Sequence, residues 1–253
     1  MGSAILKGIL SKKIAGSKQI IIFDSDKSKI SSVSKKFSVR RAAGNKDLVE
    51  QADIVVLAVK PQEFKTVADQ IRSQLNSNQV VISILAGTPV AKIKKYLIRG
   101  RIVRAMPNLG AQVAEGITAI TSSDRQALKI SEIIFSGCGK VIRLNERHFD
   151  LVTAVSGSGL AYFFLLMELL ARVANQNGLS KQEANLLAIQ TAVGAAQLAQ
   201  NSSYDPETLR KMVTSKKGTT DAALRHLEKK GFSKIFIEAI HQAMKRSKQL
   251  SKM

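Results

Sequence analysis

The densest group of side chains able to bind a ligand lies at residues 214–220, TSKKGTT, which we call the hydroxyl loop. Ser215, Thr219 and Thr220 offer hydroxyl groups, and Gly218 lets backbone N–H groups approach a ligand. The loop precedes a predicted helix, where free N–H groups and the helix dipole favour a bound carboxylate. An ordinary Ser or Thr helix cap is the competing interpretation.

A second group of candidate residues follows three predicted strands, residues 54–59, 80–84 and 101–105. In an α/β sheet, ligands bind beyond the carboxyl ends of the strands. Each turn by itself has a conformational explanation, but three turns along one sheet edge favour a nucleotide-binding crevice. The residues concerned are Lys60 and Pro61, Ala86, and Met106 with Asn108.

Asp24 ends the predicted strand 19–23 and follows Gly2 by about 20 positions, the spacing at which an acidic residue bonds the ribose of a dinucleotide. A simple turn aspartate explains the residue equally well. Ser25 and Lys27 could instead receive a 2′-phosphate, so the sequence leaves NAD and NADP both open.

The elements that position these turns are predicted within the first 146 residues, where short apolar runs alternate with amphipathic stretches. Such alternation is typical of a parallel sheet flanked by helices. Thr88 and Pro89 are expected to open a helix as its cap and its first-turn proline. The other predicted strands are 19–23 and 140–143, and the other predicted helices are 3–10, 27–37, 46–52, 62–75 and 125–135.

From His148 onward the pattern predicts helices only. Residues 151–174 are the longest apolar run, long enough to cross a membrane. The serine-glycine run at residues 156–159 and an expected Glu168–Arg172 pair favour a helix buried in a core or an interface. Further helices are expected at 181–200 with a Ser180–Glu183 capping box, after Asp205-Pro206, at 219–230 and at 233–250. We therefore predict two domains, 1–146 and 147–253.

Charge and cysteine content narrow the function. The 39 Lys and Arg residues outnumber the 19 Asp and Glu residues, and the net charge is +20. Because this excess is spread along the chain without an aromatic-interleaved basic patch, a generally basic surface is favoured over a nucleic-acid site. The single Cys138 excludes a disulfide within the chain, and the three histidines lack metal-ligand spacing. The start, MGSAILKGIL, lacks a signal-peptide layout, so the expected location is cytoplasmic.

Read in order, these segments resemble the pyrroline-5-carboxylate reductase family. The matching stretches cover essentially the whole chain: MGSAILKGIL, AVKPQ, AGTPVAKI, RAMPN with EGITAI, DLVTAVSGSGLAYFF and MVTSKKGTTDAAL. The serine-glycine run and the hydroxyl loop are the most specific of them. The resemblance implies an α/β Rossmann-type N-terminal domain followed by an all-α domain that forms homodimers, which in this family often assemble into decamers.

The resemblance also implies the reaction and its residues. A hydride from NADPH or NADH would reduce the small-molecule substrate 1-pyrroline-5-carboxylate to L-proline, with no metal, membrane or nucleic-acid partner. Ser215, Gly218 and Thr219 would hold the substrate carboxylate, and Thr220 would hydrogen-bond the imine nitrogen. The residues that would line the cofactor are Gly2, Lys60, Pro61, Ala86, Met106 and Asn108, to which the spacing argument adds Asp24 and Ser25.

The chain departs from the family pattern in its turns and at its start. Leu109-Gly110 stand where the family has Thr-Pro, Leu160 replaces a proline, and Lys217 replaces a glycine. The family's opening strand and the first two glycines of G-x-G-x-x-G are absent, with Gly2 in the place of the third. We therefore expect a Rossmann domain without its central first strand, from a misassigned start or a natural truncation, and weak cofactor binding. The alternative is that residues 19–23 shift inward or that another segment fills the gap.

Two other functions stay open on the sequence. One is a related NAD(P)-dependent imine or β-hydroxyacid reductase with the same two-domain plan. The other is a non-catalytic basic binding protein that keeps the scaffold.

Overall fold

The computed structural model describes residues 1–252, which form two units. The first unit is Met1–Gly157 together with the chain from Ala243 onward, and the second is Ser158–Gln242. The division predicted between residues 146 and 147 lies before the structural one. The sequence did not indicate that the C-terminal end returns to the first unit.

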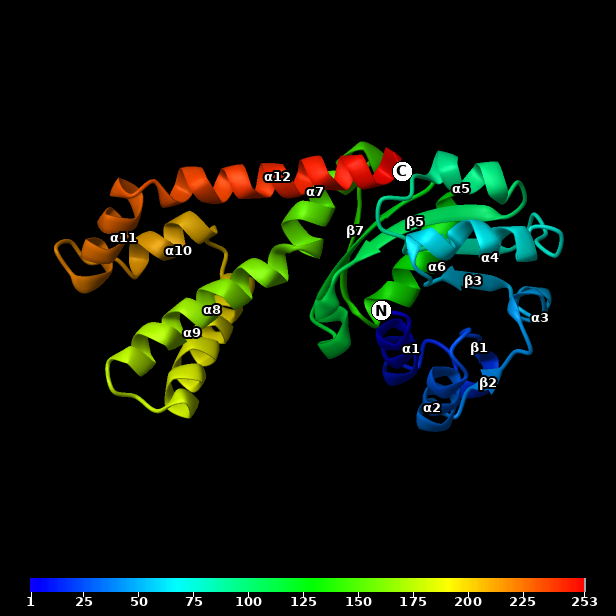
Figure 1. Cartoon of the computed structure of the whole chain (residues 1–253), viewed down its shortest axis with the longest axis horizontal. Coiled ribbons are helices and arrows are strands. Elements are labelled where there is room, and N and C mark those ends of the chain that lie inside the picture. The colour runs from blue at the N-terminus through cyan, green and yellow to red at the C-terminus, as the bar shows by residue number, and fades with distance from the viewer. Residues whose placement is uncertain (253) are drawn as a thin grey trace. The chain divides into compact units, whose positions relative to one another are not determined.

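The first unit is built on a five-stranded sheet (Figure 1), whose strand order is β3-β4-β5-β6-β7. Its strands are β3 (Ile54–Leu57), β4 (Val80–Ser83), β5 (Arg101–Pro107), β6 (Gly116–Thr121) and β7 (Gly139–Arg143). β3, β4 and β5 are parallel, but β6, which was not among the predicted strands, runs antiparallel to β5, and β7 runs parallel to β6. The prediction of a parallel sheet is therefore correct for β3–β5 and wrong for β7. The reason is the short link Leu109–Val113 between β5 and β6, because a parallel crossover needs a dozen residues or more.

Alternate side chains of the central strands enter two separate cores, as the period of a strand requires. Val80, Ile82 and Val103 lie in one core with α1 and α6, and Val81 and Ile102 lie in the other with α4 and α5. β4 is buried at every position, because helices cover both faces of the sheet. The helices of this unit are α1 (Gly2–Ser11), α2 (Lys27–Phe37), α3 (Asn45–Glu50), α4 (Phe64–Ile71), α5 (Val90–Tyr96), α6 (Arg125–Ser136) and α7 (Phe149–Val152).

A separate two-stranded sheet pairs β1 (Ile21–Ile22) with β2 (Arg40–Arg41) in parallel. Within residues 1–252, no ladder joins β1 to β3, so β3 is an edge strand. The strand predicted as buried over residues 54–59 therefore has an open side, and Ile54 is 38% exposed. In the strand order of a Rossmann sheet, the central first strand lies between these two edges.

The second unit contains helices only, over the residues described. They are α8 (Gly159–Gln176), α9 (Lys181–Asn201), α10 (Pro206–Met212), α11 (Thr219–Lys229) and the first part of α12 (Phe232–Lys252). α8 and α9 lie side by side (Figure 1). The predicted capping box is confirmed, since Glu183 N–H donates to Ser180 Oγ at 3.3 Å and Ser180 N–H donates to Glu183 Oε2 at 2.9 Å.

The apolar run predicted as one helix is interrupted by a π-helix at Thr153–Gly157. Among the residues described, the helical run Glu146–Gln176 alone has the length and apolar composition to cross a membrane. Its apolar side chains are not covered by this chain: Phe163 is 62% exposed and Val173 is 59% exposed. Of the two expectations for this run, a domain core and an interface, the core is not seen within the described residues, and burial in an interface stays a prediction.

Candidate functional site

Five of the predicted cofactor residues lie at the end of, or directly after, strands of the five-stranded sheet. β3 and β4 end at the same level of the sheet, because Leu57 pairs with Ser83, whereas β5 continues beyond Arg104, the partner of Ser83, to Pro107. The segments that follow these strands therefore leave the sheet at the edge where α/β proteins bind ligands. These segments carry Lys60 and Pro61, Ala86, and Asn108, with Met106 in the last part of β5.

Gly2 lies close to the segment that follows β3. A Cβ on Gly2 would lie 3.3 Å from Ala58 Cβ, so a larger residue would crowd the start of α1. Met1 precedes the helix without a side-chain cap, which leaves the first N–H groups of α1 for an anion. The residues present therefore fit the phosphate end of a dinucleotide.

Asp24 follows β1 and is held by its own turn. Its carboxylate accepts a hydrogen bond from Asp26 N–H at 3.0 Å and lies 3.6 Å from Lys29 Nζ. These contacts account for the turn role of the aspartate and leave the second carboxylate oxygen beside a cation. The role of Asp24 and Ser25 toward the ribose stays a prediction.

Asn108 joins the end of β5 to the π-helix. Its Nδ2 donates to Ser156 Oγ at 3.2 Å, and its Oδ1 accepts from Ile117 N–H at 3.2 Å. A Cβ on Gly157 would lie 2.9 Å from Met106 Cε, so a larger residue here would require the end of the Met106 side chain to shift. Short π-helices occur frequently at functional sites. The structure thus adds Ser156 and Gly157, from the serine-glycine run, to the predicted pair Met106 and Asn108.

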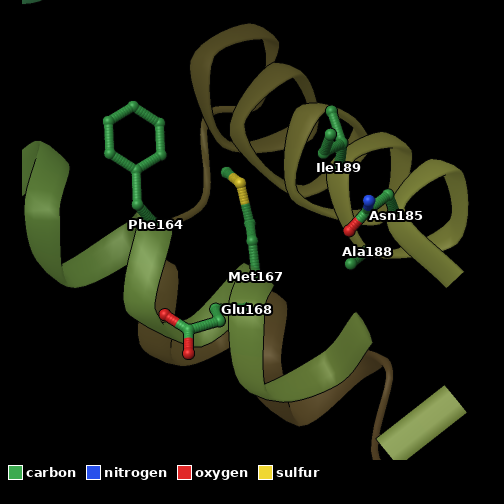
Figure 2. A pocket seen from close by; sticks show the side chains of 6 residues that line it. All are labelled: Phe164, Met167, Glu168, Asn185, Ala188 and Ile189. Atoms are coloured by element: carbon green, nitrogen blue, oxygen red, sulfur yellow. The ribbon is translucent and has the colours of Figure 1, made fainter. Parts of the chain in front are cut away.

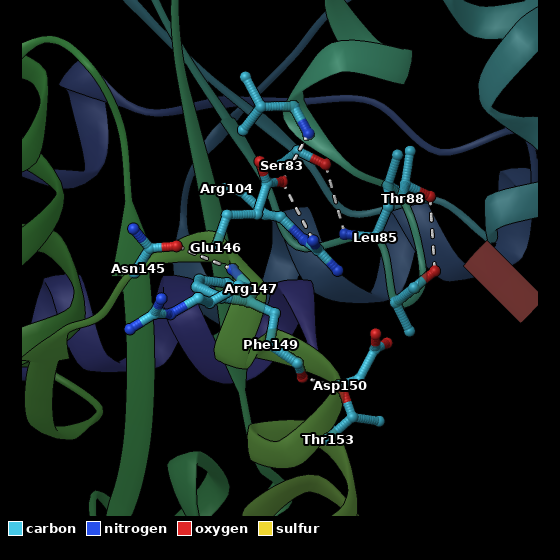
Figure 3. Close-up of polar contacts among 12 residues, drawn as sticks. Ser83, Leu85, Thr88, Arg104, Asn145, Glu146, Arg147, Phe149, Asp150 and Thr153 are labelled. Atoms are coloured by element: carbon cyan, nitrogen blue, oxygen red, sulfur yellow. Dashed lines mark hydrogen bonds and ion pairs between the residues drawn. The ribbon is translucent and has the colours of Figure 1, made fainter. Parts of the chain in front are cut away.

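Figure 3 shows a polar cluster beside this edge, centred on Arg104 and Glu146. Arg104 Nη1 lies 3.1 Å from Glu146 Oε1, and the same oxygen accepts a hydrogen bond from Val90 N–H at 2.7 Å. The Arg104 guanidinium also lies over the Phe149 ring, 4.7 Å from its centroid. A carboxylate distant in sequence therefore satisfies the first N–H group of α5.

The predicted cap of α5 is accordingly wrong. The N-cap position is Pro89, and the Thr88 hydroxyl donates to Ala86 O at 3.4 Å instead of capping the helix. A further long-range bond fixes this region, because Ser247 Oγ, near the C-terminal end, donates to Asp150 Oδ1 at 2.7 Å.

The hydroxyl loop lies in the second unit, between α10 and α11. Gly218 is the N-cap of α11, and no side chain caps the helix, which rules out the ordinary Ser or Thr cap. A Cβ on Gly218 would overlap Ser215 Oγ, so the loop brings this hydroxyl against the helix start. Thr219 and Thr220 are the first helical residues. The predicted substrate residues therefore meet at a helix N-terminus with N–H groups free of side-chain caps.

Asp221 is a residue of this loop region that the sequence reasoning missed. Its Oδ2 accepts a hydrogen bond from Lys217 N–H at 2.9 Å, and its Oδ1 accepts one from Arg225 Nε at 3.0 Å. An acidic residue in the first turn of a predicted helix was the available signal. Across residues 1–252, no cluster of three or more His, Cys, Asp or Glu side chains could hold a metal ion.

Comparison with known proteins covers both units. Residues 146–250 match a family model described as pyrroline-5-carboxylate reductase dimerisation. Residues 1–87 match one described as NADP oxidoreductase, coenzyme F420-dependent. A pyrroline-5-carboxylate reductase of Methanosarcina acetivorans is 35% identical over 256 residues, which cover 100% of this chain and 95% of the relative.

Solved structures give the same result over the whole chain. The pyrroline-5-carboxylate reductase of Coxiella burnetii is 35% identical with a TM-score of 0.92, over 100% of this chain and 95% of that one. The pyrroline carboxylate reductase of Plasmodium falciparum, solved with NADP bound, is 29% identical with a TM-score of 0.88, over 99% and 94% of the two chains.

Proposed function

The chain belongs to the pyrroline-5-carboxylate reductase family, and on that premise we propose that it reduces 1-pyrroline-5-carboxylate to L-proline with the hydroxyl loop as its substrate site. The chemistry supplied by a bound nicotinamide cofactor is hydride transfer to the imine carbon. NADP is the cofactor bound in the Plasmodium falciparum relative, and the match over residues 1–87 is to NADP oxidoreductases. The chain's own residues bind and orient the reactants.

On the cofactor side, the start of α1 and the turns after β3, β4 and β5 form the binding edge. Gly2 and the N–H groups of α1 would receive the pyrophosphate. Lys60, Pro61, Ala86, Met106 and Asn108 would line the remainder, as the resemblance predicts. Asn108 is already oriented by Ile117 N–H and Ser156 Oγ, so it presents a fixed carboxamide.

On the substrate side, the observation that carries the proposal is the uncapped start of α11 beside Ser215. Ser215, Gly218 and Thr219 would hold the substrate carboxylate with hydroxyl and backbone N–H groups. The Thr220 hydroxyl would hydrogen-bond the imine nitrogen and fix the ring. Because a protonated cyclic imine is already electrophilic, no side-chain base is needed.

The direct test is NADPH consumption by the purified chain with 1-pyrroline-5-carboxylate as substrate. Substrate-dependent loss of NADPH absorbance with formation of proline supports the proposal. An inert chain that instead binds nucleic acid in a salt-sensitive manner would support the basic binding protein. The full-length similarity to pyrroline-5-carboxylate reductases does not favour that alternative or a related reductase.

A second copy of the chain is the proposed cover for the apolar faces of α8 and α9. Phe164 is 60% exposed and Leu186 is 65% exposed, and exposed apolar surface costs about 25 cal/mol per Å². Figure 2 shows a groove between the two helices, lined by Phe164, Met167, Glu168, Asn185, Ala188 and Ile189. The dimerisation match over residues 146–250 supports a homodimer. Assembly into decamers and a cytoplasmic location remain expectations of the sequence analysis.

A further inference from the structure

Lys217 adopts a backbone conformation that residues with side chains seldom adopt. Its φ is +61°, in the left-handed region. It is the third residue of a four-residue turn, closed by a hydrogen bond of 3.0 Å from Gly218 N–H to Ser215 O. A positive φ at this position favours glycine in type II turns. A lysine here therefore carries a conformational cost that a glycine would avoid.

A carboxylate holds this turn in place. Asp221 Oδ2 accepts a hydrogen bond from Lys217 N–H at 2.9 Å, and Asp221 Oδ1 accepts one from Arg225 Nε at 3.0 Å. The Asp221 side chain is only 19% exposed, so water competes weakly for the bond to the loop. Asp221 is thus fixed by α11 on one oxygen and restrains the loop backbone with the other.

The Arg225 partner also matters for charge. The Asp221 carboxylate lies beside the loop proposed to bind the substrate carboxylate, and two like charges repel each other. This repulsion is stronger when the carboxylates are shielded from water. Arg225, at 3.0 Å from Asp221, offsets that charge. The cluster can therefore restrain the loop without making it repel an anion.

We infer that Asp221 is a positioning residue for the hydroxyl loop, needed in this chain because position 217 is a lysine and not a glycine. The inference rests on the proposed function of the loop as the substrate site. Asp221 acts through Lys217 N–H and keeps Ser215, Gly218 and Thr219 in one arrangement. With glycine at position 217, the turn forms without help from a carboxylate.

The test is a double-substitution cycle with Asp221→Ala and Lys217→Gly, measured as kcat, KM for 1-pyrroline-5-carboxylate and KM for NADPH. In the natural chain, Asp221→Ala should raise the KM for 1-pyrroline-5-carboxylate about tenfold, since one charge-assisted hydrogen bond is lost. The KM for NADPH should stay unchanged. In the Lys217→Gly background, the same substitution should change the KM for 1-pyrroline-5-carboxylate less than about twofold.

Asp205→Ala is the matched control. Asp205 caps α10 in the same unit by accepting Thr208 N–H at 2.8 Å. Its loss should lower the melting temperature as Asp221→Ala does, but leave the KM for 1-pyrroline-5-carboxylate unchanged. A rise in that KM with Asp205→Ala would show a general loss of helix stability and overturn the inference.

The remaining outcomes separate the inference from the proposed function. An equal rise in KM from Asp221→Ala in both backgrounds overturns the link to Lys217 and leaves the substrate site intact. If Asp221→Ala has no effect while Thr220→Ala lowers turnover, the inference alone fails. If neither substitution alters the kinetics, the hydroxyl loop is not the substrate site.

Discussion

Arg104 Nη1 lies 3.1 Å from Glu146 Oε1, which ties the middle of the sheet to the start of the helical run Glu146–Gln176. The Arg104 side chain is 6% exposed and the Glu146 side chain is 35% exposed. Glu146 also accepts a hydrogen bond from Val90 N–H. One carboxylate therefore links β5, the start of α5 and the segment that begins the helical run. Water screens this pair less than it screens an exposed one.

Glu146→Ala should therefore destabilise the protein by about 2 kcal/mol, because it leaves Arg104 buried without its partner. Glu132→Ala is the control. In the Glu132–Arg143 pair the arginine is more exposed than Arg104, so this pair should contribute less than about 1 kcal/mol to the free energy of unfolding. Urea unfolding followed by circular dichroism measures both. Equal losses in the two variants would show that burial of Arg104 is not what matters.

Thr220→Ala should lower kcat for 1-pyrroline-5-carboxylate while NADPH binding stays as in the natural chain. The proposed hydrogen bond to a charged imine corresponds to roughly 1.5–3 kcal/mol, or a loss of about tenfold to a hundredfold in kcat/KM. Steady-state kinetics with NADPH fluorescence titration measure the two effects separately. Unchanged kcat/KM would remove Thr220 from the reacting centre.

Acid should destabilise the helical unit through its capping carboxylates. The hydrogen bonds from Ser180 lower the pKa of Glu183, and those from Thr208 lower the pKa of Asp205. A carboxylate with a lowered folded-state pKa stabilises the fold above its unfolded pKa of about 4, and this contribution is lost as pH falls through the folded value. Glu183→Gln and Asp205→Asn should each flatten the fall in melting temperature below about pH 5. An unaltered slope in both variants would contradict this.

Light scattering should give a mass of twice the 27.5 kDa chain at micromolar concentration. Phe164→Asp should shift the protein toward the monomer, because it places a charge on the exposed apolar face of α8. Ile98→Glu is the control: Ile98 is 89% exposed but lies in the first unit, so its substitution should leave the mass unchanged. A stable monomer of the natural chain would refute the dimer.

The open edge of β3 gives a further prediction. An N-terminal extension that supplies a strand and Gly-x-Gly should pair with this edge, raise the melting temperature and tighten NADPH binding severalfold. An extension of equal length made of glycine and serine is the control. If the natural chain already binds NADPH as tightly as the extended one, the added strand is dispensable.

Elements with local causes could be predicted from the sequence. α2 has the predicted limits, residues 27–37, because its apolar spacing and the polar residue before it act within a few positions. The same holds for the box of Ser180 and Glu183. The two-domain class, a Rossmann-type domain before a helical dimerisation domain, is likewise confirmed by the fold and the family matches.

Features that depend on distant partners could not be predicted. Thr88 is a residue type that commonly caps helices, but Glu146, which is distant in sequence, accepts the hydrogen bond from the first N–H group of α5. β6 was not predicted from the sequence, and its antiparallel direction follows from the short link Leu109–Val113 that precedes it. In the hydroxyl loop, the hydroxyl residues were predicted from their types and their role stays a prediction. The role we propose for Asp221 depends on the backbone angle of Lys217, which no residue pattern reveals.

The first unit is discontinuous along the chain, and this affects the order in which it can be completed during translation. Two residues from the C-terminal part of α12 contact this unit. Ser247 Oγ donates a hydrogen bond to Asp150, and a Cβ on Gly87 would lie 3.3 Å from the backbone nitrogen of Ser251. On the ribosome, domains generally fold as they emerge from the N-terminal side. Here Ser247 and Ser251 complete the surroundings of Asp150 and of the turn after β4, so the edge proposed for the cofactor reaches its final form only after these residues have left the ribosome.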